Sequence, residues 1–372
     1  MYAAHRGGGE KARATWQSIL NGVIVLIMTS NDFDPLFSTD TAVGANAVPI
    51  TQAKIRAWVR SPWLRDLVEV FGGGVSFDAP TAQLLAALEA FSDRWDFRRM
   101  ARERGAASDD RQAQSGSARW LSAGTDIDPG SEARVMQNVE RLGLTITSNP
   151  RRASYDAILV LGGARLSCYL RAVRAAELVQ SGTRARTIGL LGAARPVADS
   201  ERDATDTYAP GAQDEFDLAM AGGEKAFGFD RRHFDEQRFE DRETPNAGWF
   251  VRRGEVAYAG QDLHMVALAA PSSDPTRRRA NSADTLVFFL DHEHIASGSL
   301  VLLITSQIYV PYVQLEALRT VGIPRQVTVE TIGFPGRDRM PELQGMSGTN
   351  HYLQEVRSAI QAARRFYDAY PE

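Results

Sequence analysis

The sequence predicts an α/β fold, with a doubly wound, mostly parallel sheet of five strands that follows a helical N-terminal region. The chain has 372 residues, of which 44% are hydrophobic and 24% charged, so it is long enough to build a large core. Up to residue 150 the apolar residues recur mainly at helical spacing. After that point short apolar runs alternate with amphipathic segments, which is typical of a parallel sheet with helices on both faces.

The N-terminal region, residues 1–150, begins with a strongly apolar run, Ile19–Met28. This run is too short to cross a bilayer as a helix. It could be the core of a signal peptide, but Met28–Asp32 offers no convincing small-residue cleavage site. A buried helix or strand is the favoured interpretation, and its apolar surface predicts that residues 1–150 pack on the sheet.

Four further helices are predicted before residue 150. Residues 50–71 contain two of them, the third begins near residue 78, and the fourth ends before residue 144. The breaks and caps expected to bound them are Ser61-Pro62, Gly72–Gly74, Asp78 as an N-cap, Ser131 as an N-cap and Gly143. Ala106–Ser117 is small, polar and without periodicity, which indicates a linker or a mobile loop.

Residues 151–372 form the predicted α/β domain. Its expected strands are Ala157–Leu161, Thr187–Leu191, His264–Ala269, Leu300–Thr305 and Gln326–Ile332. Its expected helices are Leu166–Gln180, Asn281–His294, Val310–Val321 and His351–Tyr367. Residues 199–260 read as an insertion that holds helices and a hairpin over Gly248–Gly260, turning at Arg253-Gly254.

The carboxyl ends of the strands are the expected ligand site, because ligands bind there in open parallel sheets. Glycines at two of these ends would let a ligand approach backbone N–H groups, and arginines would offer planar forks to phosphate or carboxylate. The expected ligand-binding residues are Gly162, Gly163, Arg165, Gly192, Arg195, Asn281, Ser282, Thr305 and Ser306. The alternative is a purely structural role: tight turns need glycine without any ligand, and the arginines pair with nearby carboxylates.

Two carboxylates just beyond the second strand, Glu201 and Asp203, are candidate catalytic residues. They could act as a general base, orient a ribose hydroxyl or hold a metal, or they could belong to an acidic surface loop. Arg277–Arg279 is either a solvated basic turn or a phosphate site. The pattern around Cys168 predicts a buried structural thiol. His292 and His294 do not share a helix face, so they are not expected to form a metal site.

The global charge and the cysteine content limit the classes of partner. A formal net charge of −4 gives no general attraction to nucleic acid or to anionic membranes. A single cysteine excludes an internal disulfide and favours the cytoplasm. The sequence also contains no G-x-S-x-G elbow of the esterase type. The expected partner is therefore an anionic small molecule, with the oligomeric state left open.

From about Tyr155 onward the order of these features resembles the YdcF/SanA/ElyC-like family. The matching landmarks are Gly162-Gly163, Gly192, Glu201, Asn281-Ser282 and Thr305-Ser306. The chain departs from the family pattern at four positions. Asp284 stands where glutamate is usual, Thr285 where asparagine is common, and Tyr309 and Tyr312 where many members have histidine and then arginine.

The resemblance implies a Rossmann-type fold and a nucleotide-like ligand, with S-adenosylmethionine suggested for some members and envelope-related roles for membrane-anchored ones. The favoured hypothesis is an enzyme of the YdcF-like type that binds an anionic nucleotide-like molecule, with Glu201 or Asp203 as its base. One alternative is a non-catalytic ligand-sensing or scaffold protein. Another, an S-adenosylmethionine-dependent transferase, rests on the resemblance alone.

Overall fold

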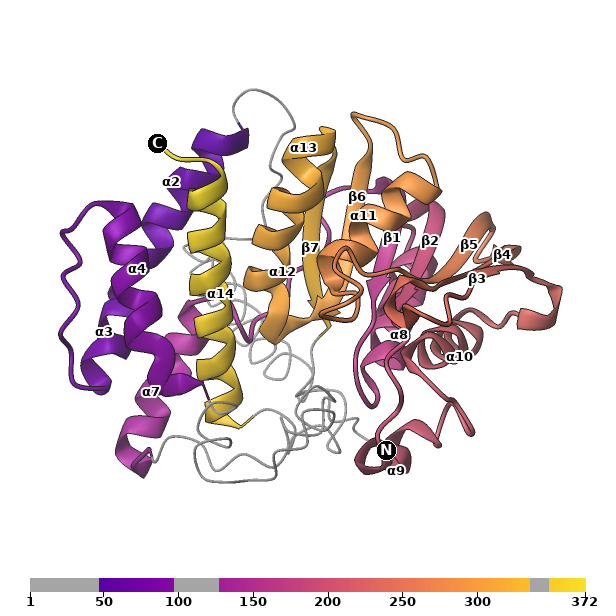
Figure 1. Cartoon of the computed structure of the whole chain (residues 1–372). Coiled ribbons are helices and arrows are strands. Elements are labelled where there is room, and N and C mark those ends of the chain that lie inside the picture. Colours follow the sequence, from indigo (N-terminus) through magenta and orange to yellow (C-terminus); the bar gives the residue numbers. More distant parts are fainter. Residues whose placement is uncertain (1–46, 97–126, 335–347) are drawn as a thin grey trace, which may run out of the picture. The chain divides into compact units, whose positions relative to one another are not determined.

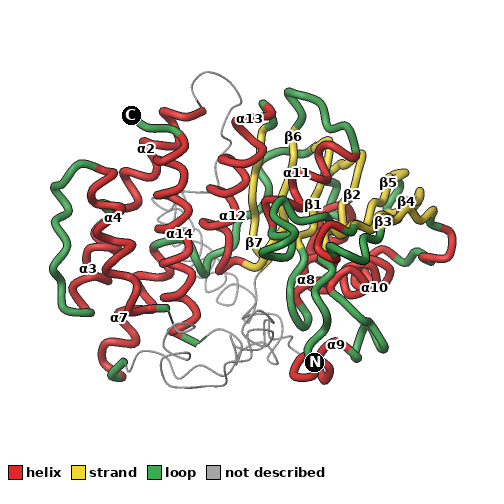
Figure 2. The backbone as a smooth tube through the Cα atoms, viewed as in Figure 1, coloured by secondary structure: helices red, strands yellow, loops and turns green. Residues whose placement is uncertain are grey.

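The computed structural model describes residues 47–96, 127–334 and 348–372, all within one structural unit that spans residues 36–372. The run Ile19–Met28 and the linker Ala106–Ser117 lie outside the described residues. The described part contains a mixed, mostly parallel sheet of seven strands with helices on both faces (Figures 1 and 2). The α/β class is confirmed, but the expected number of five strands is wrong.

Five neighbouring strands of the sheet are parallel to one another. They are β1 (Ser154–Leu161), β2 (Arg184–Gly192), β5 (Gln261–Ala269), β6 (Leu300–Ser306) and β7 (Thr328–Phe334). Their spatial order is β5-β2-β1-β6-β7, and all four neighbouring pairs are parallel. The chain therefore builds outward from β1 first on one side and then on the other. The strand order reverses between β1 and β6.

Two antiparallel strands, β3 (Asp235–Phe239) and β4 (Trp249–Tyr258), extend the sheet beyond β5. The predicted turn at Arg253-Gly254 is wrong, because β4 runs straight through these residues. The turn lies at Ala259-Gly260, both with positive φ, where the pair Tyr258 and Gln261 closes a hairpin between β4 and β5. An alanine–glycine turn is a weaker signal than the arginine–glycine dipeptide that the sequence offered earlier.

Helices cover both faces of the parallel strands. On one face α8 (Ser167–Gln180) and α10 (Glu215–Phe227) pack against Ile158, Val160 and Ile188. On the other face α11 (Ser282–His292) and α12 (Val310–Ala317) pack against Leu159 and the other strand side chains that point to this face. Residues 199–260 thus include α10, which covers the sheet between β2 and the β3–β4 edge.

A second core is built by the helices before β1 together with the C-terminal helix. These helices are α2 (Ala47–Val59), α3 (Pro62–Val70), α4 (Thr81–Ser92), α7 (Pro129–Arg141) and α14 (Thr349–Ala369). Leu315 of α12 and the following Leu318 also belong to this core, so α12 has the sheet on one side and the helices on the other.

Short elements complete the described part. They are η2 (Asp93–Trp95), η4 (Asp199–Glu201), α9 (Arg202–Thr205), η5 (Arg231–His233), η6 (Pro245–Ala247), η7 (Gln307–Tyr309), the π-helical η8 (Leu318–Gly322) and α13 (Ile323–Arg325). Among the described helices none is both long and apolar enough to span a membrane.

Two of the predicted helix caps are wrong. The third helix, α4, begins at Thr81 without a side-chain cap, rather than at Asp78. The fourth, α7, is capped by Asp128, whose side chain accepts hydrogen bonds from Gly130 N and Ser131 N. Asp128 precedes a proline that suits the first helical turn, so the helix begins earlier than Ser131.

Candidate functional site

The carboxyl ends of β1, β2, β5 and β6 meet at one edge of the sheet because these strands are parallel. Loops leave this edge after Leu161, Gly192, Ala269 and Ser306. The reversal of strand order between β1 and β6 also lies here, which is where open α/β sheets bind ligands. The glycines of these loops and the charged side chains beside them form what we call the strand-end cluster. Its charged members are Arg165, Arg171, Arg195, Glu201, Asp214, Glu215 and Arg279.

The glycines at two strand ends are required by close packing of the chain itself. A Cβ on Gly192 would lie 2.6 Å from Phe216 Cα and 2.9 Å from the carbonyl oxygen of Glu215. A Cβ on Gly162 would lie 2.5 Å from the Leu191 carbonyl oxygen and would overlap Glu215 Oε1. These glycines let the N-terminus of α10 approach β1 and β2, so a ligand is not needed to explain them.

Arg195 lies between two carboxylates. Its Nε donates to Glu215 Oε2 at 2.9 Å, and its Nη1 lies 3.1 Å from both oxygens of Glu201. Glu201 is fully buried, with 0% of its surface exposed. Burial by itself would lower the pKa of Arg195, but the charges and hydrogen bonds of Glu215 and Glu201 hold it above its usual value.

Arg195, Glu201 and Glu215 thus form a charged triad. A second arginine, Arg279, lies close to this triad and is only half-buried. Burial lowers the pKa of Arg279, the positive charge of Arg195 lowers it further, and Glu215 opposes the shift. The Nη2 atom of Arg195 is buried without a hydrogen-bond partner within the described residues. Donor capacity and positive charge are thus both present beside Glu215.

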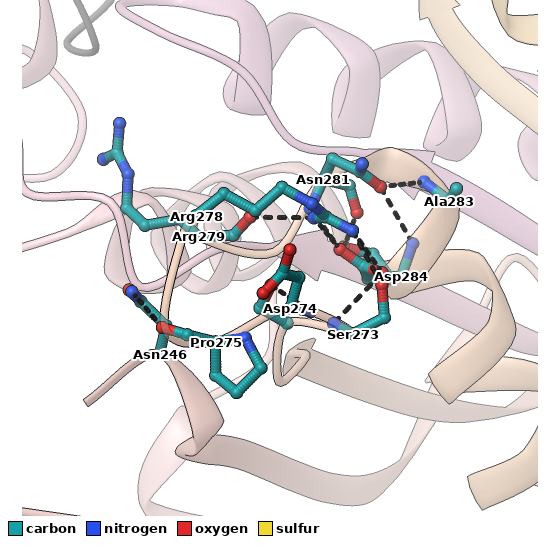
Figure 3. A network of polar contacts seen from close by, with 11 residues as sticks. Asn246, Ser273, Asp274, Pro275, Arg278, Arg279, Asn281, Ala283 and Asp284 are labelled. Carbon is teal, nitrogen blue, oxygen red and sulfur yellow. Dashed lines mark hydrogen bonds and ion pairs between the residues drawn. The ribbon is translucent and has the colours of Figure 1, made fainter. Parts of the chain in front are cut away.

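Arg279 is held in place by the loop between β5 and α11 (Figure 3). Arg278 forms an ion pair with Asp284, and its Nη2 donates to Ser273 Oγ at 2.7 Å. Asn281 caps α11 by accepting from the backbone N–H groups of residues 283 and 284, at 2.9 and 3.1 Å. The Arg279 side chain points away from the Arg278–Asp284 pair. The Arg277–Arg279 turn therefore contains one arginine used in the loop and another directed elsewhere.

Arg171 of α8 is a member of the cluster that the sequence reasoning missed. It is 4% exposed, and its Nη1 donates to the carbonyl oxygens of Leu161, at 2.9 Å, and of Gly162. Its Nη2 contacts Ser306 Oγ at 3.1 Å, so one guanidinium joins the ends of β1 and β6. The available signal was an arginine three residues after Cys168, on the helix face that packs on the sheet.

The remaining predicted residues differ in how they are placed. Thr305 is buried and Ser306 contacts Arg171, whereas Ser282 is exposed at the first position of α11. Arg165, with a φ of 53°, donates from Nη1 to the Ser200 carbonyl oxygen at 3.3 Å. Asp203 is exposed on α9. The structure thus brings Glu201 into the cluster but leaves Asp203 on the surface.

The single cysteine lies beneath the cluster as a buried thiol. The Cys168 Sγ donates to the Gly163 carbonyl oxygen at 3.1 Å. Burial and the nearby charge of Glu215 raise the pKa of Cys168 to about 12, so it is protonated at neutral pH and is a poor nucleophile. No group of three or more potential metal ligands is found in the part of the chain that the structure describes.

A cavity of about 680 Å³ lies beside α10. Tyr208, Lys225, Phe229 and Arg231 contribute to its walls. Arg231 pairs with Glu224 there, so this arginine already has an opposite charge. The cavity holds no counterpart of the Arg195–Arg279 arrangement, and we place the candidate site at the strand ends for that reason.

Comparisons with known proteins identify relatives over almost the whole chain. Residues 43–143 match the family model described as the Rv3785 N-terminal domain. The chain is 35% identical over 336 residues to the uncharacterized protein Rv3785 of Mycobacterium tuberculosis, covering 89% of this chain and 93% of the relative. The same values hold for the uncharacterized protein Mb3814 of Mycobacterium bovis. No solved structure matches the chain significantly. The chain therefore belongs to the Rv3785 protein family.

Proposed function

We propose that this protein binds an anionic, phosphate-bearing small molecule of the nucleotide type at the strand-end cluster. The observation that carries the proposal is that two positively charged side chains, Arg195 and Arg279, lie close enough for their charges to interact. The Nη2 atom of Arg195 is buried without a hydrogen-bond partner among the described residues. The pKa of Arg279 is lowered by burial and by the positive charge of Arg195. An anion between them would accept hydrogen bonds and relieve the repulsion between the two charges.

The surrounding charges support an anionic ligand. Arg165, Arg171, Arg195 and Arg279 contribute four positive charges at the strand ends, while Glu201, Asp214 and Glu215 contribute three carboxylates. The order of the five parallel strands further supports a Rossmann-like core, in which phosphates bind at the switch point. S-adenosylmethionine is a cation overall at neutral pH, so this balance favours a nucleotide phosphate over it.

The geometry supports binding more directly than it supports catalysis by the predicted base. Both oxygens of Glu201 face the same guanidinium nitrogen, and the side chain has no access to solvent. Glu201 is better suited to orient Arg195 than to accept a proton. An enzyme of the YdcF-like type remains our proposal for the overall class, with a cytoplasmic location as the single cysteine suggests.

The proposal is tested by calorimetric titration of the full chain with ATP, ADP, inorganic phosphate and S-adenosylmethionine. Arg279→Met should weaken binding of the preferred phosphate compound roughly 10- to 100-fold, because a charge-assisted hydrogen bond contributes about 1.5–3 kcal/mol. Arg277→Met is the matched control, since Arg277 belongs to the same turn and is exposed. It should bind as the unmodified protein does.

Two results would contradict the proposal. One is that none of the phosphate compounds binds to the folded protein. The other is that Arg279→Met and Arg277→Met bind with equal affinity, because the site would then not depend on the half-buried arginine.

A further inference from the structure

The strand β3 forms one edge of the seven-stranded sheet (Figure 1). It pairs with β4 on one side, and no described strand pairs with it on the other. All five of its residues are exposed, so neither face of this strand is covered by a helix of the described part. Its outer backbone N–H and C=O groups are positioned to extend the sheet.

The side chains of β3 carry charges in a particular order, Asp-Glu-Gln-Arg-Phe. Glu236 and Arg238 lie on the same face of the sheet, because residues two apart in a strand share a face. Arg238 is 58% exposed, and its Nη1 lies 4.0 Å from Glu236 and 3.5 Å from Glu240. Its ion pairs within the chain are therefore long and solvated, which leaves its charge accessible to a partner.

Two copies of β3 can pair in three antiparallel registers that are centred on one of the three inner residues of the strand. Residues directly opposite must share a face, so the twofold axis passes through a residue. An axis at Glu236 places Glu236 opposite itself, and an axis at Arg238 places Arg238 opposite itself. An axis at Gln237 places Glu236 of each copy opposite Arg238 of the other. Only this register joins opposite charges, and it does so twice.

We propose that β3 is a self-association edge, where a second copy of this chain adds its own β3 in antiparallel orientation about a twofold axis at Gln237. The partner is identified by the charge order, since the strand is complementary to itself in one register. The resulting sheet would continue across both copies. This inference is independent of the proposed ligand site, which lies at the other strands' carboxyl ends.

The alternative is that charged residues protect the edge from pairing, as in many natural sheets. Such protection works when like charges meet, and two of the three registers are blocked in that way. The third register is favoured by two opposite-charge pairs, so the same residues select a single mode of pairing. Because one short strand buries little surface, we expect a weak dimer whose population depends on protein concentration.

The test is sedimentation equilibrium of the full chain and of two charge variants. Glu236→Arg would place arginines opposite each other, and Arg238→Glu would place glutamates opposite each other. Each variant should weaken self-association roughly tenfold or more, because symmetry changes two pairs at once. An equimolar mixture of the two variants should associate again, since every pair in the mixed dimer joins arginine to glutamate.

The controls separate this edge from general effects of charge and of folding. Glu243→Arg and Arg242→Glu make the same charge changes at exposed positions beyond the strand and should leave association unchanged. Glu236 also pairs with Arg252 of β4, so Glu236→Arg could loosen the edge itself. Hydrogen exchange of the unmodified chain avoids this problem. Amides of β3 should become more protected as the protein concentration rises.

Three results would overturn the proposal. A chain that stays monomeric at its highest soluble concentration has no such interface. A dimer that persists equally in both charge variants uses another surface. Protection of β3 that is independent of concentration, or a variant mixture that does not associate, would also exclude this edge.

Discussion

Two arginine–carboxylate contacts, Arg195 in the strand-end cluster and Arg134 in the helical region before β1, differ in their burial and in the number of charges around them. In the helical region Asp66 receives hydrogen bonds from Arg134 Nε, at 2.8 Å, and from Asn138 Nδ2, at 2.6 Å. The hydrogen bonding of Arg134 is the main cause of the lowered pKa of Asp66. Arg134 keeps 51% of its side chain exposed. These charges are paired one to one, next to water.

The strand-end cluster gathers several charges around one largely buried arginine, Arg195. Arg195 has 11% of its side chain exposed and faces two glutamates, while Arg279 adds a further positive charge nearby. Asp214, which precedes Glu215, has a raised pKa, chiefly because of burial. Surface pairs such as Arg134–Asp66 contribute little to stability, whereas buried charges are costly to desolvate and are commonly found at functional sites. This difference in burial supports our proposal that the ligand binds at the strand ends.

The largest effect in this comparison is expected from removing the central arginine of the cluster. Arg195→Met leaves Glu201 buried beside Glu215 without a cation between them, so unfolding free energy should fall by about 3–5 kcal/mol. Urea denaturation at neutral pH measures the change. Arg134→Met in the helical region is the matched control and should shift the midpoint only slightly. Equal losses in the two variants would show that the two regions do not differ.

A double variant sharpens this test. In Arg195→Met, Glu201 and Glu215 both lose their arginine partner. Adding Glu201→Gln removes one of these two negative charges and should restore part of the lost stability. The recovered free energy measures the coupling within the triad. No recovery would mean that the loss in Arg195→Met comes from packing rather than from charge.

A smaller effect is expected from glycine substitutions in the two regions. Gly192→Ala forces a methyl group against the backbone of α10, 2.6 Å from Phe216 Cα, and should destabilise the fold by about 1–3 kcal/mol. Gly130→Ala in the first turn of α7 meets only the end of the Asp128 side chain, at 3.1 Å. Alanine is a better helix former, so this control should be close to neutral. Thermal unfolding of both variants would contradict the comparison if their midpoints shifted equally.

The central strands could be predicted from the sequence because they are continuous apolar runs. Residues 157–161 are buried on both faces of the sheet, which produces a continuous run of apolar residues in the sequence. The edge strand β3 could not be found in the same way, and β4 lies within the predicted hairpin over residues 248–260, whose turn was placed in the middle of this strand. β3 is charged and exposed at every position, so it has no apolar periodicity, and its pairing depends on β4. The strand count was wrong for that physical reason.

The location of the candidate site followed from strand topology, but the roles of its side chains did not. Whether Arg195 meets a carboxylate or a ligand depends on Glu215, which lies 20 residues further along the chain. Asn281 was expected to bind a ligand, yet its side chain caps α11 together with Asp284, three residues later. That spacing is a readable capping signal. Arg171 could have been noticed as an arginine on a core-facing helical position.

The smallest effects are expected from replacing one aspartate in each region, and they should have opposite signs. The pKa of Asp66 is lowered in the folded protein, so its contribution to stability is present above the unfolded pKa and is lost as pH falls through the folded value. The pKa of Asp214 is raised, so its contribution is present at acid pH and is lost as pH rises through the folded value.

Asp66→Asn should therefore lower the unfolding free energy at neutral pH by about 0.5 kcal/mol, because the pair is partly solvated. Asp214→Asn should raise it by roughly 0.5–1 kcal/mol, since asparagine can still cap α10 by accepting from Asp217 N while removing a desolvated charge. Urea titrations between pH 3 and pH 7 measure both, and the differences from the unmodified protein should shrink towards acid pH. If Asp214→Asn were destabilising at neutral pH, Asp214 would be stabilised as an anion, and the cluster would resemble the helical region rather than contrast with it.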